Sequence, residues 1–258
     1  MWFLAANAFA HDLWLEIDPD EATLEVEGFI GEHLTEAEPY RLKSADRVAR
    51  FELVGPESQA DMATAVRTDR DRFATLPLEN EQGTFAVVLE MNPISIALAA
   101  KTFEDYIAEE GLTDVQTAHE PGTIGRELYS RSIVSLVGIG PKGKVKKTAE
   151  VATGAKPDLT LQLVPVTNPL LAKPGDEVTF RLVFGGEPLG DRQVMAASRG
   201  GEDDVQQVVG RTDADGNVTF TIDRSGYWIV RLVHMVPSTE PGSDWRSYWA
   251  ALTFPVTG

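Results

Sequence analysis

The sequence contains no cysteine. This absence excludes disulfides, thiolate metal sites such as zinc fingers, and cysteine nucleophiles. Basic residues are also scarce: 23 lysines and arginines stand against 40 aspartates and glutamates, so the net charge is −17. A chain this acidic repels nucleic acid and draws cations toward its surface. We therefore expect no nucleic-acid partner.

Long hydrophobic runs are missing as well. Beyond Ala10 no apolar stretch approaches the ~20 residues that a membrane-spanning helix needs, so we expect no transmembrane helix after processing. The first ten residues, MWFLAANAFA, are largely apolar and end in Ala-Phe-Ala, the A-x-A form after which signal peptidase cleaves. Because the charged segment that normally begins a signal peptide is missing, we interpret residues 1–10 as a signal peptide remnant. The alternative is an ordinary apolar N-terminal strand. Cleavage there predicts an exported protein that begins at His11.

The apolar residues are mostly spaced as in β-strands. Residues 12 to about 98 contain alternating or short apolar runs, such as ATLEVEGFIGE and GTFAVVLEM, bounded by glycine and proline. One stretch, KTFEDYIAEEGL, has helical spacing instead, with Phe103, Tyr106 and Ile107 on one face. Thr102 is placed to cap its first turn, and Gly111 suits the position after its last turn. We predict one short helix near 102–110.

A polar stretch, KGKVKKTAEVATGAK, precedes Pro157 and divides the sequence. After it come seven short β-rich segments separated by glycine, proline and aspartate, a spacing typical of a β-sandwich. Within them TDADGNV resembles the start of a calcium loop but lacks the full ligand series, which predicts a tight turn. We expect a mainly β protein of two antiparallel sandwich-like modules: a β-rich domain over 11–150 with the helix, and an Ig-like sandwich over 157–258.

Histidine is rare, with four residues in the whole chain. After cleavage behind Ala10, His11 would offer a metal ion both its α-amino nitrogen and its imidazole. An α-amino group has a pKa of about 8, so a metal can displace its proton near neutral pH. This arrangement is the histidine brace of copper proteins, and it needs a further imidazole to complete a nitrogen-rich site.

His33 and His234 are the candidates for that further ligand. His33 lies in GFIGEHL, just past a predicted strand, where loops often carry sites; the alternative is an exposed turn residue. In GYWIVRLVHMV, strand alternation places His234 at the end of the apolar face formed by Trp228, Val230 and Leu232. A core histidine hydrogen-bonded to a carbonyl is the alternative there. We expect packing or loop roles for the remaining candidates. His119 is interpreted as a loop residue, Met235 as a packing residue and not a metal ligand, and the aromatic cluster of Trp245, Tyr248 and Trp249 as core packing and not a sugar-binding platform.

No nucleophile with a base, phosphate loop or G-x-S-x-G motif is present, so we predict no enzyme, and neither catalytic nor cofactor-binding residues. Several stretches together resemble a family of bacterial periplasmic proteins, the NikM-like group, which carries a domain of unknown function associated with nickel and cobalt uptake. The stretches are AHDLWLE, GFIGEHL, FEDYIAEEGL, RELYSR, LVPVTNPLLAKPGDEVTFRLVFGGEPLG, RTDADGNVTFTIDRSGYWIVRLVHM and DWRSYWAALTF.

The resemblance implies a periplasmic metal-binding accessory protein with an Ig-like or prealbumin-like C-terminal module. His11, His33 and His234 fall at the histidine positions of that family. We therefore expect the chain to bind a divalent transition-metal ion, nickel, cobalt or copper, and to serve a membrane metal-uptake complex. Nitrogen ligands alone do not select the metal, because affinity rises toward copper for almost any such site. The alternative is a structural or ligand-binding β-sandwich adaptor without metal.

Overall fold

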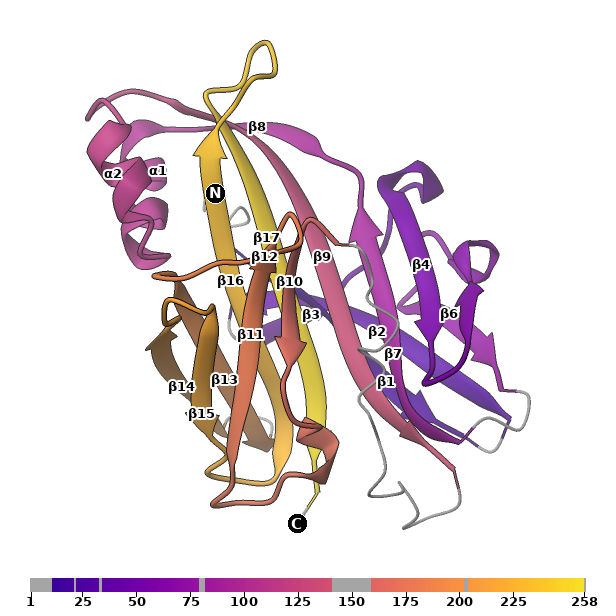
Figure 1. Cartoon of the computed structure of the whole chain (residues 1–258). Coiled ribbons are helices and arrows are strands. Elements are labelled where there is room, and N and C mark those ends of the chain that lie inside the picture. The colour runs from indigo at the N-terminus through magenta and orange to yellow at the C-terminus, as the bar shows by residue number, and fades with distance from the viewer. Residues whose placement is uncertain are drawn as a thin grey trace.

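The computed structural model describes residues 11–20, 22–32, 34–78, 82–140, 159–201 and 204–257. Its centre is a nine-stranded sheet in the order β14-β13-β16-β17-β9-β7-β4-β5, with β8 paired to the first residues of β9 (Figure 1). The strands of this central sheet are β4 (Val48–Val54), β5 (Gln59–Asp61), β7 (Gly83–Met91), β8 (Ile94–Leu98), β9 (Gly125–Ile139), β13 (Gln193–Gly201), β14 (Asp204–Arg211), β16 (Gly226–Pro237) and β17 (Trp245–Val256).

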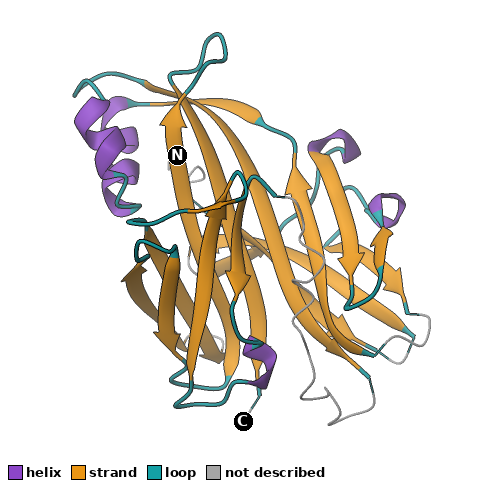
Figure 2. Cartoon of the chain, viewed as in Figure 1, coloured by secondary structure: helices purple, strands orange, loops and turns teal. Residues whose placement is uncertain are grey.

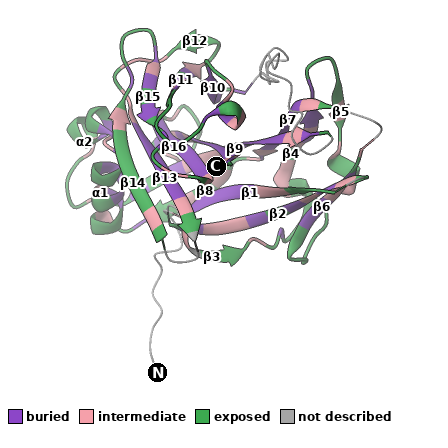
Figure 3. Ribbon diagram, turned by 90° about the horizontal axis from the view of Figure 1, so that it is seen from below, coloured by how far each residue is buried: buried purple, intermediate pink, exposed green. Residues whose placement is uncertain are grey.

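Two four-stranded sheets cover the two faces of the central sheet, and Figure 3 shows the resulting layers. The first covering sheet comprises β10 (Leu161–Pro165), β11 (Glu177–Phe184), β12 (Glu187–Pro188) and β15 (Asn217–Thr221). The second comprises β1 (Asp12–Pro19), β2 (Thr23–Glu32), β3 (Thr35–Pro39) and β6 (Arg72–Pro77). Helices α1 (Ala100–Glu109) and α2 (Thr113–Ala118) lie beside one end of the central sheet, and short 3-10 helices occupy 45–47, 63–65 and 169–171 (Figure 2).

The prediction of a mainly β protein is confirmed. The apolar sequence of β7 is explained by the burial of this strand on both faces. Val87 and Leu89 pack toward β1 and β2, whereas Ala86 and Val88 pack toward β10 and β11. A strand covered on both faces needs apolar residues at every position, because neither face meets water. The continuous run FAVVL in this strand therefore marks the middle layer of the molecule.

One strand pair joins the two predicted modules. β9, from the N-terminal half, pairs in parallel with β17, the last strand, with Ile133 opposite Ala251. Both halves thus contribute to one hydrogen-bonded sheet. The dividing stretch at 141–157 and the signal-like residues 1–10 lie outside the described residues.

The predicted helix is confirmed as α1, whose residues Phe103, Tyr106 and Ile107 are buried. Its start was predicted wrongly: Ala99 occupies the N-cap position, so Thr102 lies inside the helix and caps nothing. Alanine is the strongest helix former, which explains the extra residues at the start. Gly111 has φ +63° and ends the helix as predicted, since this conformation is costly for residues with a Cβ. The second helix, α2, was not predicted.

The TDADGNV segment forms the expected tight turn between β14 and β15. The Asp213 carboxylate accepts hydrogen bonds from the backbone N–H groups of Asp215 and Asn217, at 2.9 and 2.8 Å. These bonds hold the pKa of Asp213 below its usual value, with the Asn217 contact the largest cause. Neither described α-helix is long and apolar enough to cross a membrane.

Candidate functional site

His11 lies at the start of β1, where two arginines of the central sheet hold the chain. The His11 carbonyl oxygen accepts a hydrogen bond from Nη2 of Arg131 on β9 at 2.9 Å. The next residue, Asp12, is buried and forms an ion pair with Nε of Arg231 on β16 at 3.0 Å. The His11 side chain itself is half-buried. The beginning of β1 is therefore fixed against the sheet, which places the first candidate ligand at a defined position.

Arg231 is the centre of a buried charge cluster. Its Nη1 donates to both carboxylate oxygens of Glu110, the C-cap residue of α1, at 2.5 and 2.7 Å. Burial raises the pKa of Glu110, although the Arg231 charge opposes that shift. Burial alone would lower the pKa of Arg231, but the carboxylates of Asp12 and Glu110 outweigh it and raise that pKa. The cluster ties β1, α1 and β16 together directly beside His11.

The β1–β2 register shows what lies opposite this position. The two strands are antiparallel, with Asp12 opposite Gly31 and Leu13 opposite Ile30. The start of β1 therefore stands beside the end of β2, whose last residue is Glu32. His33, the second candidate ligand, follows Glu32 directly in the sequence but lies outside the described residues.

His234 occupies the place on β16 that strand alternation predicted, at the end of an apolar face. It is 5% exposed, and its ring meets Phe184 of β11 edge to face with 4.5 Å between centroids. Burial, assisted by the positive charge of Arg192 and opposed by Asp114, lowers the pKa of His234 to about 4. The imidazole is therefore neutral at pH 7.

The structure does not bring His234 to His11. Side chains alternate along a strand, so Arg231 and His234 project from opposite faces of the central sheet. Arg231 reaches β1 through Asp12, whereas His234 contacts β11 in the other covering sheet. In the part of the chain that the structure describes, no three or more histidine, aspartate and glutamate side chains cluster closely enough to hold a metal ion. His11 and His234 are therefore not ligands of one ion in this fold.

The other singled-out residues have packing roles. The His119 ring lies edge-on to Phe103, with 4.8 Å between centroids. Met235, Trp245 and Trp249 are buried in the cluster that seats α1 and α2 on the sheet. Trp245 and Trp249 are each only 7% exposed, so they do not form an open platform for stacking sugars.

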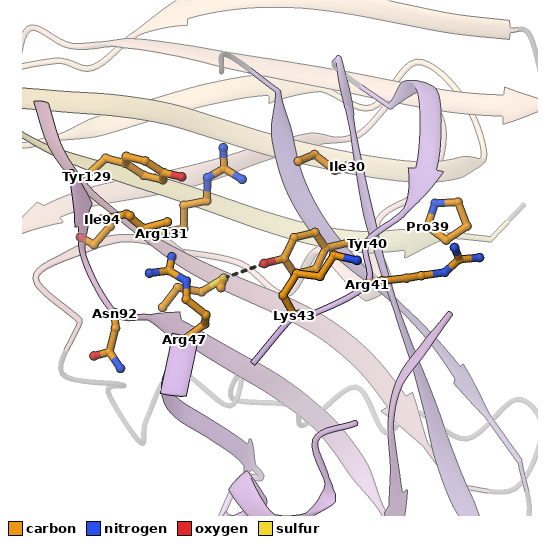
Figure 4. A pocket seen from close by; sticks show the side chains of 12 residues that line it. Ile30, Pro39, Tyr40, Arg41, Lys43, Arg47, Asn92, Ile94, Tyr129 and Arg131 are labelled. Atoms are coloured by element: carbon orange, nitrogen blue, oxygen red, sulfur yellow. Dashed lines mark hydrogen bonds between the residues drawn. The ribbon is translucent and has the colours of Figure 1, made fainter. Parts of the chain in front are cut away.

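Sequence reasoning missed a cavity of about 520 Å³ between the β1–β2–β3–β6 sheet and the central sheet (Figure 4). Four basic residues line it: Arg41, Lys43, Arg47 and Arg131. Arg131 also holds the His11 carbonyl, so the cavity adjoins the start of β1. The available signal was Arg131 itself, a charged residue within the strand RELYSRSIVSLVGI. The other basic residues come from separate segments of the chain, and no local sequence pattern indicates that these segments lie close together.

A protein-family model covers most of the chain. Residues 8–236 match the model of a family described as a domain of unknown function, DUF4198. No curated protein matches the sequence. The matched segment begins just before β1 and ends within β16, so it includes the start of β1, the basic cavity and His234.

Proposed function

Because the chain belongs to the DUF4198 family, whose description names no activity, we propose from its own residues that it is a non-enzymatic periplasmic protein that binds a divalent transition-metal ion. It presents this ion, nickel, cobalt or copper, to a membrane uptake complex. The resemblance of its sequence to NikM-like proteins supports the nickel and cobalt assignment. The signal-like residues 1–10 support export.

One observation carries the metal proposal. The β1–β2 register sets His11, the residue before Asp12, beside Glu32, the last residue of β2, and His33 is the next residue in the sequence. After cleavage behind Ala10, His11 supplies an amine and an imidazole, and His33 supplies a second imidazole. Three nitrogen donors suit nickel, cobalt and copper. His234 has no part in this site, because the central sheet separates it from His11.

The anchoring of the first residues supports the same proposal. A metal site assembled from a chain terminus loses affinity if the terminus must first be ordered, because ordering costs conformational entropy. Here Arg131 holds the His11 carbonyl and Arg231 holds Asp12. The terminus is thus positioned before the ion arrives.

The test is calorimetric titration of metal-free protein that begins at His11 with nickel, cobalt and copper chlorides. We expect one ion per chain and a loss of affinity of at least about tenfold in His11→Ala and in His33→Ala, since each removes a ligand. His234→Ala is the matched control and should bind as the unaltered protein does. Absence of tight binding, or an equal loss in His234→Ala, would contradict the proposal and favour the adaptor without metal.

A further inference from the structure

The cavity of about 520 Å³ has the size of a small-molecule site, since such sites span roughly 300–1,000 Å³. The cavity lies where β7 ends and β8 begins. Neither of these two strands pairs with Ser130 or Arg131 of β9, so this edge of β9 is uncovered there. Ile30 of β2 and the chain after β3 form the opposite wall. Apolar side chains line much of it: Ile30, Pro39, Met91 and Ile94.

The charged groups of the cavity are all positive, although the chain as a whole carries −17. Two of them are neutralised: Arg41 pairs with Asp71 at 2.6 Å and Lys43 with Asp69 at 3.4 Å, and all four of these side chains are exposed. The other two, Arg47 and Arg131, form no ion pair with a carboxylate anywhere in the described ranges, although the charge of Arg131 opposes the rise that burial causes in the pKa of Glu127.

Arg47 and Arg131 are the two groups left to meet an anion. Nε of Arg131 is buried and has no hydrogen-bond partner within the described chain. Figure 4 shows both guanidinium groups on the side of Tyr40 nearer Tyr129, with Arg41 directed away. Burial raises the pKa of Tyr40, and the charges of Arg131 and Arg47 oppose that rise. Both cations therefore act on the same part of the cavity.

The fold holds the side chain of Arg131 and the backbone of Arg47 in place. The Arg131 guanidinium lies over the Trp249 and Tyr129 rings, at 5.2 and 5.5 Å from their centroids. Arg47 ends a 3-10 helix, and its carbonyl oxygen accepts a hydrogen bond from the Asn92 N–H at 2.8 Å. Because the Arg131 guanidinium is positioned in advance, the site loses less conformational entropy when a ligand binds.

We propose that this cavity binds a small organic anion with two or more carboxylates. The planar guanidinium matches a carboxylate through two parallel N–H···O bonds, so Arg47 and Arg131 each take one carboxylate. The carbon body of the ligand packs against Met91, Ile94 and the Tyr40 ring. These apolar walls favour an organic anion over phosphate or sulfate, which have no apolar surface to bury. The proposal goes beyond metal binding and does not depend on it.

The test is calorimetric titration of metal-free protein with succinate, glutarate, citrate and inorganic phosphate at one fixed ionic strength. We expect at least one of the carboxylates to bind one to one, and more tightly than phosphate. Arg47→Met should weaken that binding at least about tenfold, because one charge-assisted pair is lost. Arg47 touches neither His11 nor the buried charge cluster, so this variant leaves the proposed metal site intact.

Lys43→Met is the matched control, because it removes the same formal charge from an exposed, already paired position of the same cavity. It should change the affinity less than about threefold, since exposed ion pairs contribute little. Circular dichroism establishes that both variants are folded. Failure of all three carboxylates to bind, phosphate binding as tightly as they do, or equal losses in Arg47→Met and Lys43→Met would each overturn the proposal.

Discussion

Replacing Arg231 with methionine is expected to lower the free energy of unfolding by about 3–5 kcal/mol. Arg231 is 2% exposed, its partner Asp12 is 3% exposed, and Glu110 is 6% exposed. Removing the arginine takes its positive charge away from two buried carboxylates, which costs far more than the loss of a surface pair. The measurement is urea unfolding at pH 7, followed by circular dichroism.

Arg211→Met is the control for this variant. Arg211 also pairs with an aspartate, Asp191, but both side chains are largely exposed, at 46% and 78%. Solvent-exposed pairs contribute only about 0–1 kcal/mol, so this variant should remain close to the unaltered protein. Equal destabilisation by the two substitutions would show that Asp12, Glu110 and Arg231 do not form the buried cluster described above.

The second large effect concerns acid stability and His234. In the folded chain its pKa is about 4, whereas an unfolded histidine titrates near 6.5. Between these values the unfolded chain binds more protons than the folded chain, so stability falls as the pH drops from about 6.5 to about 4. The full contribution of this residue is about 3–4 kcal/mol, since each unit of difference between the two pKa values corresponds to about 1.4 kcal/mol.

His234→Leu removes this titration while keeping an apolar side chain of similar size beside Phe184. Urea unfolding at pH 7 and at pH 4.5 should therefore show a smaller loss of stability in the variant than in the unaltered protein, by about 2 kcal/mol. His119→Gln, at a half-buried position outside this face, serves as the control. Parallel loss of stability in the unaltered protein and His234→Leu would contradict the placement of a buried, neutral imidazole on this face.

The face on which each strand residue lies could be predicted from the sequence, because alternation is a local property of the chain. It placed His234 with Trp228, Val230 and Leu232, and the structure buries all four side chains. The same local rule found the buried face of α1. It did not find the start of α1, since Ala99 and Ala100 carry no capping side chain to mark it.

The arrangement of the sheets could not be predicted in this way. The pairing of β9 with β17 joins residues more than a hundred positions apart, and nothing in either strand specifies its partner. That pairing decides the candidate site, because it creates the central sheet that separates His234 from His11. The basic cavity depends on the same long-range assembly, since Arg47 and Arg131 reach it from different parts of the chain.

We propose that the α-amino group of His11 binds metal together with its imidazole. This mode of binding is tested most directly by comparing protein that begins at His11 with protein that carries one additional alanine before His11. An amide nitrogen is a poor ligand until it is deprotonated, so the extension should weaken nickel and copper binding strongly, by at least about a hundredfold, while leaving the fold unchanged. Calorimetric titration of both proteins gives the two affinities. Equal affinities would contradict the account.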